Sequence, residues 1–280
     1  MAMISAEWHE PRSLDEVLSL RAEHGEEATI IAGGSFLGII MNQGFFAPTR
    51  LVALRNVPDL DRVEVGDGVL RLGAMATHRA VERSEIVKDG WPTLAFNFSV
   101  VASPRVRNQA TVGGVVADAD YASDPPSMLA ALRARVVARS VRGEREIPME
   151  EFVLGHYETA LEDDELVTEV RVPCDDGRSS VYRKFRSRSS EDRPCVSVAA
   201  VRENGGLRVV VGAVAERPQY FPEVCAIAEG ERLDGELAAE IGRRYAEEIQ
   251  PLSDSRGSAR YRRRVIAVEV RRALEDLIYD

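Results

Sequence analysis

Cysteine is scarce in this chain of 280 residues, which contains only Cys174, Cys195 and Cys225. Three widely spaced cysteines form neither a disulfide framework nor a CxxC pair. The four histidines are equally scattered, so the sequence shows neither a metal site nor the ligands of an iron–sulfur cluster. We therefore expect no metal to be bound by this chain itself.

Long apolar runs and an excess of positive charge are also missing. No apolar run approaches the roughly 20 residues of a membrane span, and the N-terminus lacks the basic-then-apolar pattern of a signal peptide. The net charge is −10, from 36 basic and 46 acidic residues, which disfavours binding to nucleic acid and to anionic lipid. The sequence therefore predicts a cytoplasmic protein without a nucleic-acid or membrane partner.

Strand and helix patterns alternate in the first part of the chain. Residues 13–24 predict a helix with Ser13 as its N-cap, and residues 29–32 and 51–54 predict buried strands on either side of an apolar helix at residues 35–42. Together they predict a small α/β unit over about residues 1–55.

A second unit over residues 56–175 begins with a hairpin pattern and continues with helices and strands. The segment 175–180 carries the strongest boundary signal. Beyond it, three strand patterns precede two helical ones, which predicts a small α+β domain over residues 178–280.

Two glycine doublets stand where apolar segments end. One is Ala32-Gly33-Gly34-Ser35, and the other is Thr111-Val112-Gly113-Gly114, which is followed by the acidic stretch at residues 118–120. Glycines let backbone amides approach a bulky anion such as a pyrophosphate, although a tight strand-to-helix turn with a serine cap explains the first loop equally well. Two such loops favour one extended ligand held from two sides.

The flanks of the second doublet are more specific. The sequence ASPRVRNQATVGG at residues 102–114, with Asp124 ten residues after the second glycine, resembles the flavin-binding medium subunits of the molybdenum hydroxylases, the xanthine dehydrogenase and carbon monoxide dehydrogenase type. Further similarity lies at residues 73–78, 165–173 and 182–185. The resemblance therefore covers nearly the whole chain in order.

This resemblance implies an α+β fold and FAD as the cofactor. Residues 1–175 would form a bipartite FAD-binding domain of the p-cresol methylhydroxylase (PCMH) type, with two α/β subdomains at about 1–55 and 56–175. Residues 178–280 would form a domain like the C-terminal domain of CO dehydrogenase flavoproteins. In such a protein the cofactor performs the redox chemistry, and the chain supplies binding and electrostatics.

The resemblance also implies a set of FAD-binding residues but no catalytic residue. They are Ala32, Gly33, Gly34, Ser35, Phe36, Leu37, Thr77, Ala102, Asn108, Thr111, Gly113, Gly114, Val115, Asp124, Val167 and Lys184. Within the set, Thr111 would contact a phosphate or ribityl oxygen, and the Val167 backbone would meet the adenine. Asp124 would form a hydrogen bond with the ribityl chain or with the polar edge of the isoalloxazine. Lys184 would lie near that edge, where a cation stabilises the anionic reduced ring. Simpler alternatives are a helix N-cap for Asp124 and a solvent-facing side chain for Lys184.

Two functions remain open on the sequence alone. The first is a redox subunit that passes electrons from a 2Fe–2S small subunit, in a complex with a molybdopterin large subunit, to an external acceptor. The second is a stand-alone monomer or homo-oligomer that keeps FAD as a structural element for a redox-neutral cyclisation or rearrangement. It is motivated by Val115, which replaces the polar residue of the family, and by Phe36, Phe45, Phe46 and Tyr121 as a hydrophobic pocket. A binding module that has lost FAD is a third possibility.

Overall fold

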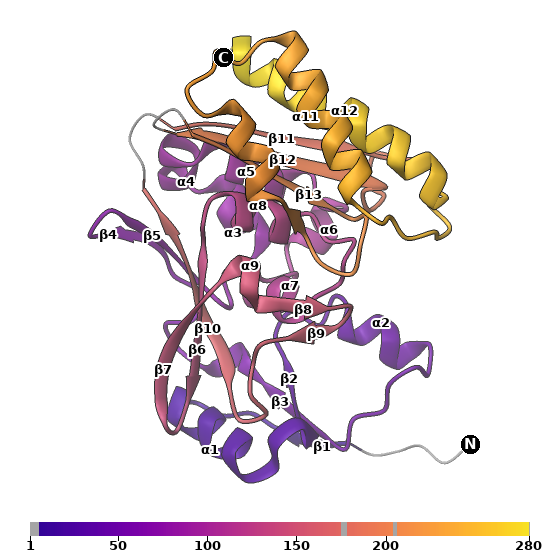
Figure 1. Ribbon diagram of the computed structural model, residues 1–280. Coiled ribbons are helices and arrows are strands. Elements are labelled where there is room, and N and C mark those ends of the chain that lie inside the picture. Colours follow the sequence, from indigo (N-terminus) through magenta and orange to yellow (C-terminus); the bar gives the residue numbers. More distant parts are fainter. Residues whose placement is uncertain (1–5, 175–177, 204–205, 280) are drawn as a thin grey trace.

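Three larger β-sheets, each formed by a continuous part of the chain, organise the fold (Figure 1). The structure is a computed structural model that describes residues 6–174, 178–203 and 206–279. The three sheets define a first, a second and a C-terminal unit, which follow one another along the sequence.

The first unit is a small parallel sheet of strand order β1-β3-β2. Its first helix begins as expected, because the Ser13 hydroxyl accepts a hydrogen bond of 3.2 Å from the Glu16 amide. The elements of this unit are β1 (Glu7–His9), α1 (Leu14–His24), the 3₁₀ helix η1 (Gly25–Glu27), β2 (Ala28–Ile31), α2 (Leu37–Asn42), β3 (Arg50–Ala53) and the 3₁₀ helix η2 (Leu54–Asn56).

The second unit contains a five-stranded sheet of order β4-β5-β10-β6-β7. All of its strand pairs are antiparallel, whereas an α/β subdomain was expected for residues 56–175. The reason is that two hairpins, β4–β5 and β6–β7, flank β10, so no helical crossover joins parallel neighbours. The elements are β4 (Val63–Gly66), β5 (Val69–Gly73), α3 (His78–Arg83), α4 (Glu85–Gly90), α5 (Pro92–Ser99), α6 (Pro104–Arg107), α7 (Val112–Ala117), α8 (Pro125–Ala131), β6 (Arg135–Ser140), β7 (Gly143–Pro148), α9 (Met149–Phe152), β8 (Val153–Gly155), β9 (Glu158–Thr159) and β10 (Leu166–Pro173).

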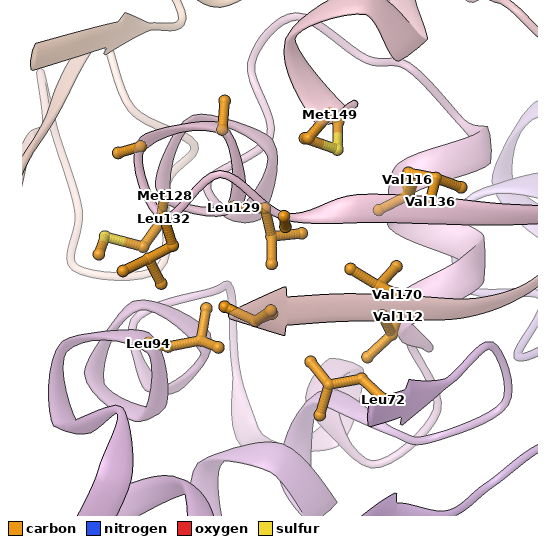
Figure 2. Close-up of a cluster of buried hydrophobic side chains, with 14 of the residues drawn as sticks. Leu72, Leu94, Val112, Val116, Met128, Leu129, Leu132, Val136, Met149 and Val170 are labelled. Atoms are coloured by element: carbon orange, nitrogen blue, oxygen red, sulfur yellow. The ribbon is translucent and has the colours of Figure 1, made fainter. Parts of the chain in front are cut away.

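The core of the second unit lies between this sheet and its helices. Figure 2 shows Leu72, Val136 and Val170 of the sheet facing Leu94 and Leu129 of α5 and α8, and all five side chains are fully buried. Burying a side chain of this size contributes about 1.5–3 kcal/mol. The core therefore fixes α7 and α8, and with them the loop between them.

The C-terminal unit is an antiparallel sheet of order β11-β12-β13-β14. Alternate residues of β12 enter different cores: Val196 and Val198 pack beneath α11 and α12, and Ala199 and Val201 join the core of the second unit. This two-sided burial explains the nearly continuous apolar sequence of β12. The elements are β11 (Ser179–Phe185), β12 (Val196–Glu203), β13 (Gly206–Gly212), β14 (Gln219–Tyr220), α10 (Pro222–Cys225), the 3₁₀ helix η3 (Ala226–Ala228), α11 (Gly235–Glu248) and α12 (Ala259–Tyr279).

The expected boundary at residues 175–180 falls partly on residues 175–177, which lie outside the described residues. The domain limits 1–175 and 178–280 therefore stay predictions. Among the described helices, none combines the length and the apolar character needed to cross a bilayer.

Candidate cofactor site

A cavity of about 800 Å³ lies where the three units meet. This volume is typical of small-molecule and cofactor sites. Most of the residues expected to bind the cofactor line it. They are Ala32, Gly33, Gly34, Ser35, Phe36, Leu37, Ala102, Thr111, Gly113, Gly114, Val115, Asp124, Val167 and Lys184.

Two of the expected residues, Thr77 and Asn108, do not belong to the lining. The Thr77 hydroxyl caps α3 by accepting a hydrogen bond of 3.1 Å from the Ala80 amide. Asn108 is exposed at the C-cap of α6. In this structure Thr77 stabilises a helix next to the cavity, and Asn108 lies outside the cavity.

The first glycine loop offers unpaired backbone amides to the cavity. Within the part of the chain that the structure describes, no N–H group of residues 33–37 donates a hydrogen bond. All five residues line the cavity, and Gly34 has a φ of 66°, a conformation that favours glycine. Consecutive unpaired amides of this kind form a concavity suited to an anion, so the loop fits the pyrophosphate of FAD.

The second glycine loop is different, because its amides are already bonded within the protein. Gly113 donates to the Ala74 carbonyl at 2.8 Å, and Gly114 donates to the Thr111 hydroxyl at 3.1 Å. A Cβ atom on Gly113 would lie 2.6 Å from the Cβ of Ala74. Gly113 therefore allows α7 to lie directly against the chain that follows β5. Among the described residues, the first doublet leaves its amides unpaired, whereas the second is needed for packing.

The two glycine loops are in direct contact with each other. A Cβ atom on Gly33 would lie 1.6 Å from the carbonyl oxygen of Gln109 and 2.6 Å from its carbonyl carbon. No side chain fits there unless one backbone moves. Gly33 is thus required by packing against the second loop, a reason that the motif alone does not reveal.

Asp124 and Lys184 meet in the wall of the cavity and are almost fully buried. The Lys184 ammonium donates to the Asp124 carboxylate at 2.8 Å and to the Val100 carbonyl at 2.8 Å, and the Tyr182 hydroxyl donates to Asp124 at 2.7 Å. Each of the two charged side chains is only 3% exposed. Burial raises the pKa of Asp124 and lowers the pKa of Lys184, and their mutual attraction opposes both effects.

The simpler alternatives for this pair are wrong. Asp124 stands at the N-cap position of α8, but its side chain makes no capping hydrogen bond. Lys184 points inward rather than to solvent, because its neighbour across the interface is Asp124 of the second unit. The pair therefore joins the C-terminal unit to the cavity wall.

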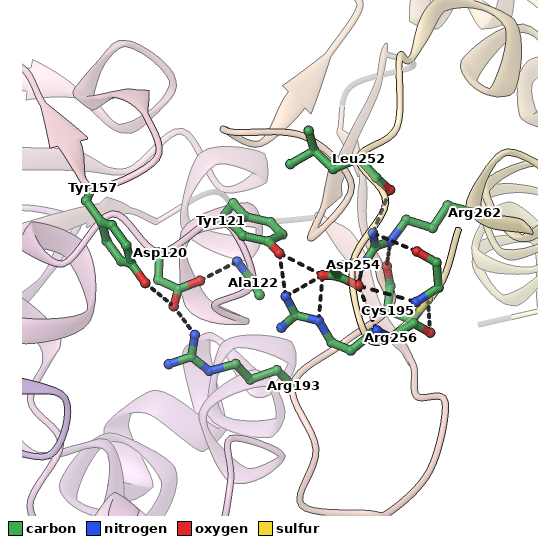
Figure 3. A network of polar contacts seen from close by, with 11 residues as sticks. Asp120, Tyr121, Ala122, Tyr157, Arg193, Cys195, Leu252, Asp254, Arg256 and Arg262 are labelled. Carbon is green, nitrogen blue, oxygen red and sulfur yellow. Dashed lines mark hydrogen bonds and ion pairs between the residues drawn. The ribbon is translucent and has the colours of Figure 1, made fainter. Parts of the chain in front are cut away.

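The lining also includes residues that the sequence analysis did not propose for the cofactor, among them Asp118, Tyr157 and Arg193. Figure 3 shows Arg193 reaching from the C-terminal unit to the carboxylate of Asp120, with which it forms an ion pair. Burial raises the pKa of Asp118 to about 7, and the nearby Arg193 opposes this shift. Asp118 belongs to the acidic stretch after the second doublet and was open to recognition, whereas Tyr157 and Arg193 stand in segments without a motif.

The polar network continues from the loop between α7 and α8 into the C-terminal unit (Figure 3). The Tyr121 hydroxyl donates to Asp254 at 2.7 Å, and Arg256 donates to Tyr121 at 2.6 Å. Tyr121 therefore forms a contact between units. Of the four residues expected to form a hydrophobic pocket, Phe36 and Phe46 line the cavity, and Phe45 and Tyr121 do not. Only part of the hydrophobic pocket expected for a stand-alone enzyme is present.

Comparison with known proteins agrees with this geometry. The family model of the FAD binding domain in molybdopterin dehydrogenase matches residues 3–175, and that of the CO dehydrogenase flavoprotein C-terminal domain matches residues 180–277. The chain belongs to this family of FAD-binding subunits. Its cofactor is FAD, and the predicted α+β fold with an FAD-binding and a flavoprotein C-terminal domain is confirmed.

Several relatives of this FAD-binding subunit match it over almost their whole length. The nicotine 6-hydroxylase medium subunit of Paenarthrobacter nicotinovorans is 32% identical over 280 residues, which cover 98% of both chains. The carbon monoxide dehydrogenase medium chain of Afipia carboxidovorans is 31% identical, over 97% of this chain and 96% of the relative. The structure of reconstituted CO dehydrogenase from Oligotropha carboxidovorans matches with a TM-score of 0.93 at 29% identity, over 98% of each chain.

Proposed function

We propose that this chain is the electron-transfer subunit of a molybdenum-containing dehydrogenase or hydroxylase. It would take electrons from a 2Fe–2S small subunit, in a complex with a molybdopterin large subunit, and pass them to an external acceptor. The observation that carries this proposal is the cavity with unpaired amides at residues 33–37, in a chain that matches medium subunits from end to end.

The residues of the cavity have separate tasks in this proposal. Amides of the first glycine loop bind the phosphates, and the contact of Gly33 with Gln109 holds that loop in place. Asp124 and Lys184 supply a buried pair of opposite charges, of which the Lys184 cation stabilises negative charge that develops on the cofactor. FAD, when bound, supplies the exchange of electrons between partner and acceptor.

The stand-alone alternative is not favoured, because the relatives are subunits of dehydrogenases and of a hydroxylase. Val115, which stands where the sequence resemblance implies a polar residue, is half-buried and lines the cavity. A cytoplasmic location stays a prediction from the sequence.

The experiment is to produce the chain together with the products of its neighbouring genes and to measure the mass of the native complex. We expect two further subunits, one carrying a 2Fe–2S cluster and one carrying molybdopterin, and a flavin absorption band in the complex. Addition of substrate should bleach this band only when the iron–sulfur subunit is present. A chain that purifies alone, with a flavin that turnover leaves oxidised throughout, would contradict the proposal.

A further inference from the structure

Charge is missing from the segment to which the phosphates of the cofactor are assigned. No residue from 33 to 49 carries a charge, although 29% of all residues in the chain are charged. Among the described residues, the amides of residues 33–37 have no hydrogen-bond partner, and these residues line the cavity. Arg or Lys side chains commonly assist such amides in binding the negative charge of a phosphate. A cation for the pyrophosphate therefore has to come from another segment of the chain.

Three basic side chains line the cavity in the part of the chain that the structure describes, and two of them lie elsewhere. They are Arg21, Lys184 and Arg193. Lys184 is held by its ion pair with Asp124. Arg21 donates to the carbonyl of Ala28 at 3.2 Å, at the first residue of the four-residue strand β2. The first glycine loop follows the opposite end of this strand, roughly 10 Å away at about 3.3 Å per residue.

Arg193 lies beside the first glycine loop. Its guanidinium carbon is 6.0 Å from the centre of the Phe36 ring, and Phe36 packs against Tyr157 with 5.5 Å between the ring centres. Arg193 belongs to the segment between β11 and β12, and Figure 3 shows its side chain reaching from there toward Asp120. The C-terminal unit thus brings a cation to the loop that has none of its own.

Arg193 also keeps hydrogen-bond donors for a ligand. A guanidinium has five N–H donors. Toward the residues that the structure describes, Nη1 of Arg193 bonds to the Asp120 carboxylate, and Nε and Nη2 form no hydrogen bond. The side chain is 46% exposed, so a ligand in the cavity can reach it. Burial raises the pKa of the nearby Asp118 carboxyl to about 7, so below this pH Asp118 carries little charge and competes weakly for the guanidinium.

We propose that Arg193 binds the pyrophosphate of FAD together with the amides of residues 33–37. The planar fork of an arginine matches two phosphate oxygens, and the amides hold others on the opposite side of the anion. FAD would thereby tie the C-terminal unit to the first unit, because each unit supplies one part of the phosphate site. This inference rests on the assignment of the phosphates to the first glycine loop in the proposed function.

The test substitutions are Arg193→Gln, Arg193→Lys and, as a matched control, Arg188→Gln. Arg188 belongs to the same segment, is 68% exposed, pairs with Asp192 at 3.6 Å and does not line the cavity. The full-length apoprotein is titrated with FAD, and binding is followed by flavin fluorescence. We expect Arg193→Gln to weaken FAD binding at least about tenfold, because a charge-assisted hydrogen bond to phosphate is lost. Arg193→Lys keeps a positive charge and should recover part of the affinity, and Arg188→Gln should leave the affinity unchanged.

Phosphorus NMR of the FAD-loaded chain identifies the group that Arg193 contacts. In Arg193→Gln the phosphorus resonances of bound FAD should shift from their wild-type positions, whereas the absorption band of the flavin should not. Normal FAD affinity in Arg193→Gln would overturn the phosphate contact, and so would weakened binding with unchanged phosphorus resonances. The titration needs no partner subunit, so either of these results would leave the proposed electron transfer standing.

Discussion

Replacing Gly33 with alanine tests the contact between the two glycine loops most directly. The new methyl group would lie 1.6 Å from the Gln109 carbonyl oxygen, so the two backbones must separate by more than an ångström to restore ordinary contact. Gly38 lies in α2, the helix that follows the first glycine loop. It is the matched control, because a Cβ atom on it would have no neighbour within 4 Å.

The structure sets the magnitude of the effect. Overpacking of this kind costs about 1–3 kcal/mol, and each kcal/mol lowers the melting temperature of a protein of this size by roughly 2–4 °C. Gly33→Ala should therefore melt roughly 2–12 °C below wild type. It should also lose affinity for FAD by at least about tenfold, because the displaced amides no longer converge on the phosphates. Gly38→Ala, within a helix, should be stabilised by about 0.5–1 kcal/mol.

The assay is thermal unfolding of the apoprotein together with FAD titration followed by flavin fluorescence. Measuring the apoprotein separates the packing cost from the loss of cofactor, which would lower the melting temperature by mass action alone. A Gly33→Ala variant with wild-type affinity and melting temperature would refute the reasoning, because it would show that the two loops are not held in contact.

Three further predictions concern ionisable side chains that are buried or half-buried. Asp124→Asn should destabilise the apoprotein by about 3–5 kcal/mol in urea unfolding, because Lys184 is left buried without its counter-charge. Arg262→Met should cost a similar amount, about 3 kcal/mol, because fully buried Arg262 holds Asp254 at 2.8 Å and the Cys195 carbonyl at 3.0 Å. The raised pKa of Asp118, about 7, means that the folded state keeps a proton which the unfolded state has lost. The contribution of Asp118 to stability should therefore fall as the pH rises from about 4 to 7, and urea midpoints of wild type relative to Asp118→Asn should decrease across this range.

Each of these predictions has a result that contradicts it. Unchanged urea midpoints in Asp124→Asn or Arg262→Met would show that the partner charges reach solvent or other partners. Identical pH profiles for wild type and Asp118→Asn would show that the Asp118 carboxyl titrates near its ordinary value in the folded protein.

The local elements of this protein follow from short stretches of sequence. Ser13 caps α1 through a contact three residues away, and the nearly continuous apolar run of β12 predicts a strand whose two faces are both buried. The class of cofactor follows from a contiguous motif around the second doublet, because residues 102–114 are neighbours in sequence and need no folding pattern to be recognised. Signals of this kind are local, so sequence alone determined them.

Contacts between distant segments were decided by the tertiary structure. The two glycine doublets look alike in the sequence. Among the residues that the structure describes, the amides of residues 33–37 donate no hydrogen bond, whereas those of Gly113 and Gly114 are bonded to Ala74 and Thr111. Lys184 bonds to Asp124, which is 60 residues away in the sequence, and Arg193 bonds to Asp120, which is 73 residues away. These partners lie in separate units, and only the packing of the three sheets around one cavity brings them together. The sequence alone indicated FAD as the cofactor, and the tertiary structure decided which residues line the cavity, because burial and hydrogen-bond pairing depend on neighbours far along the chain.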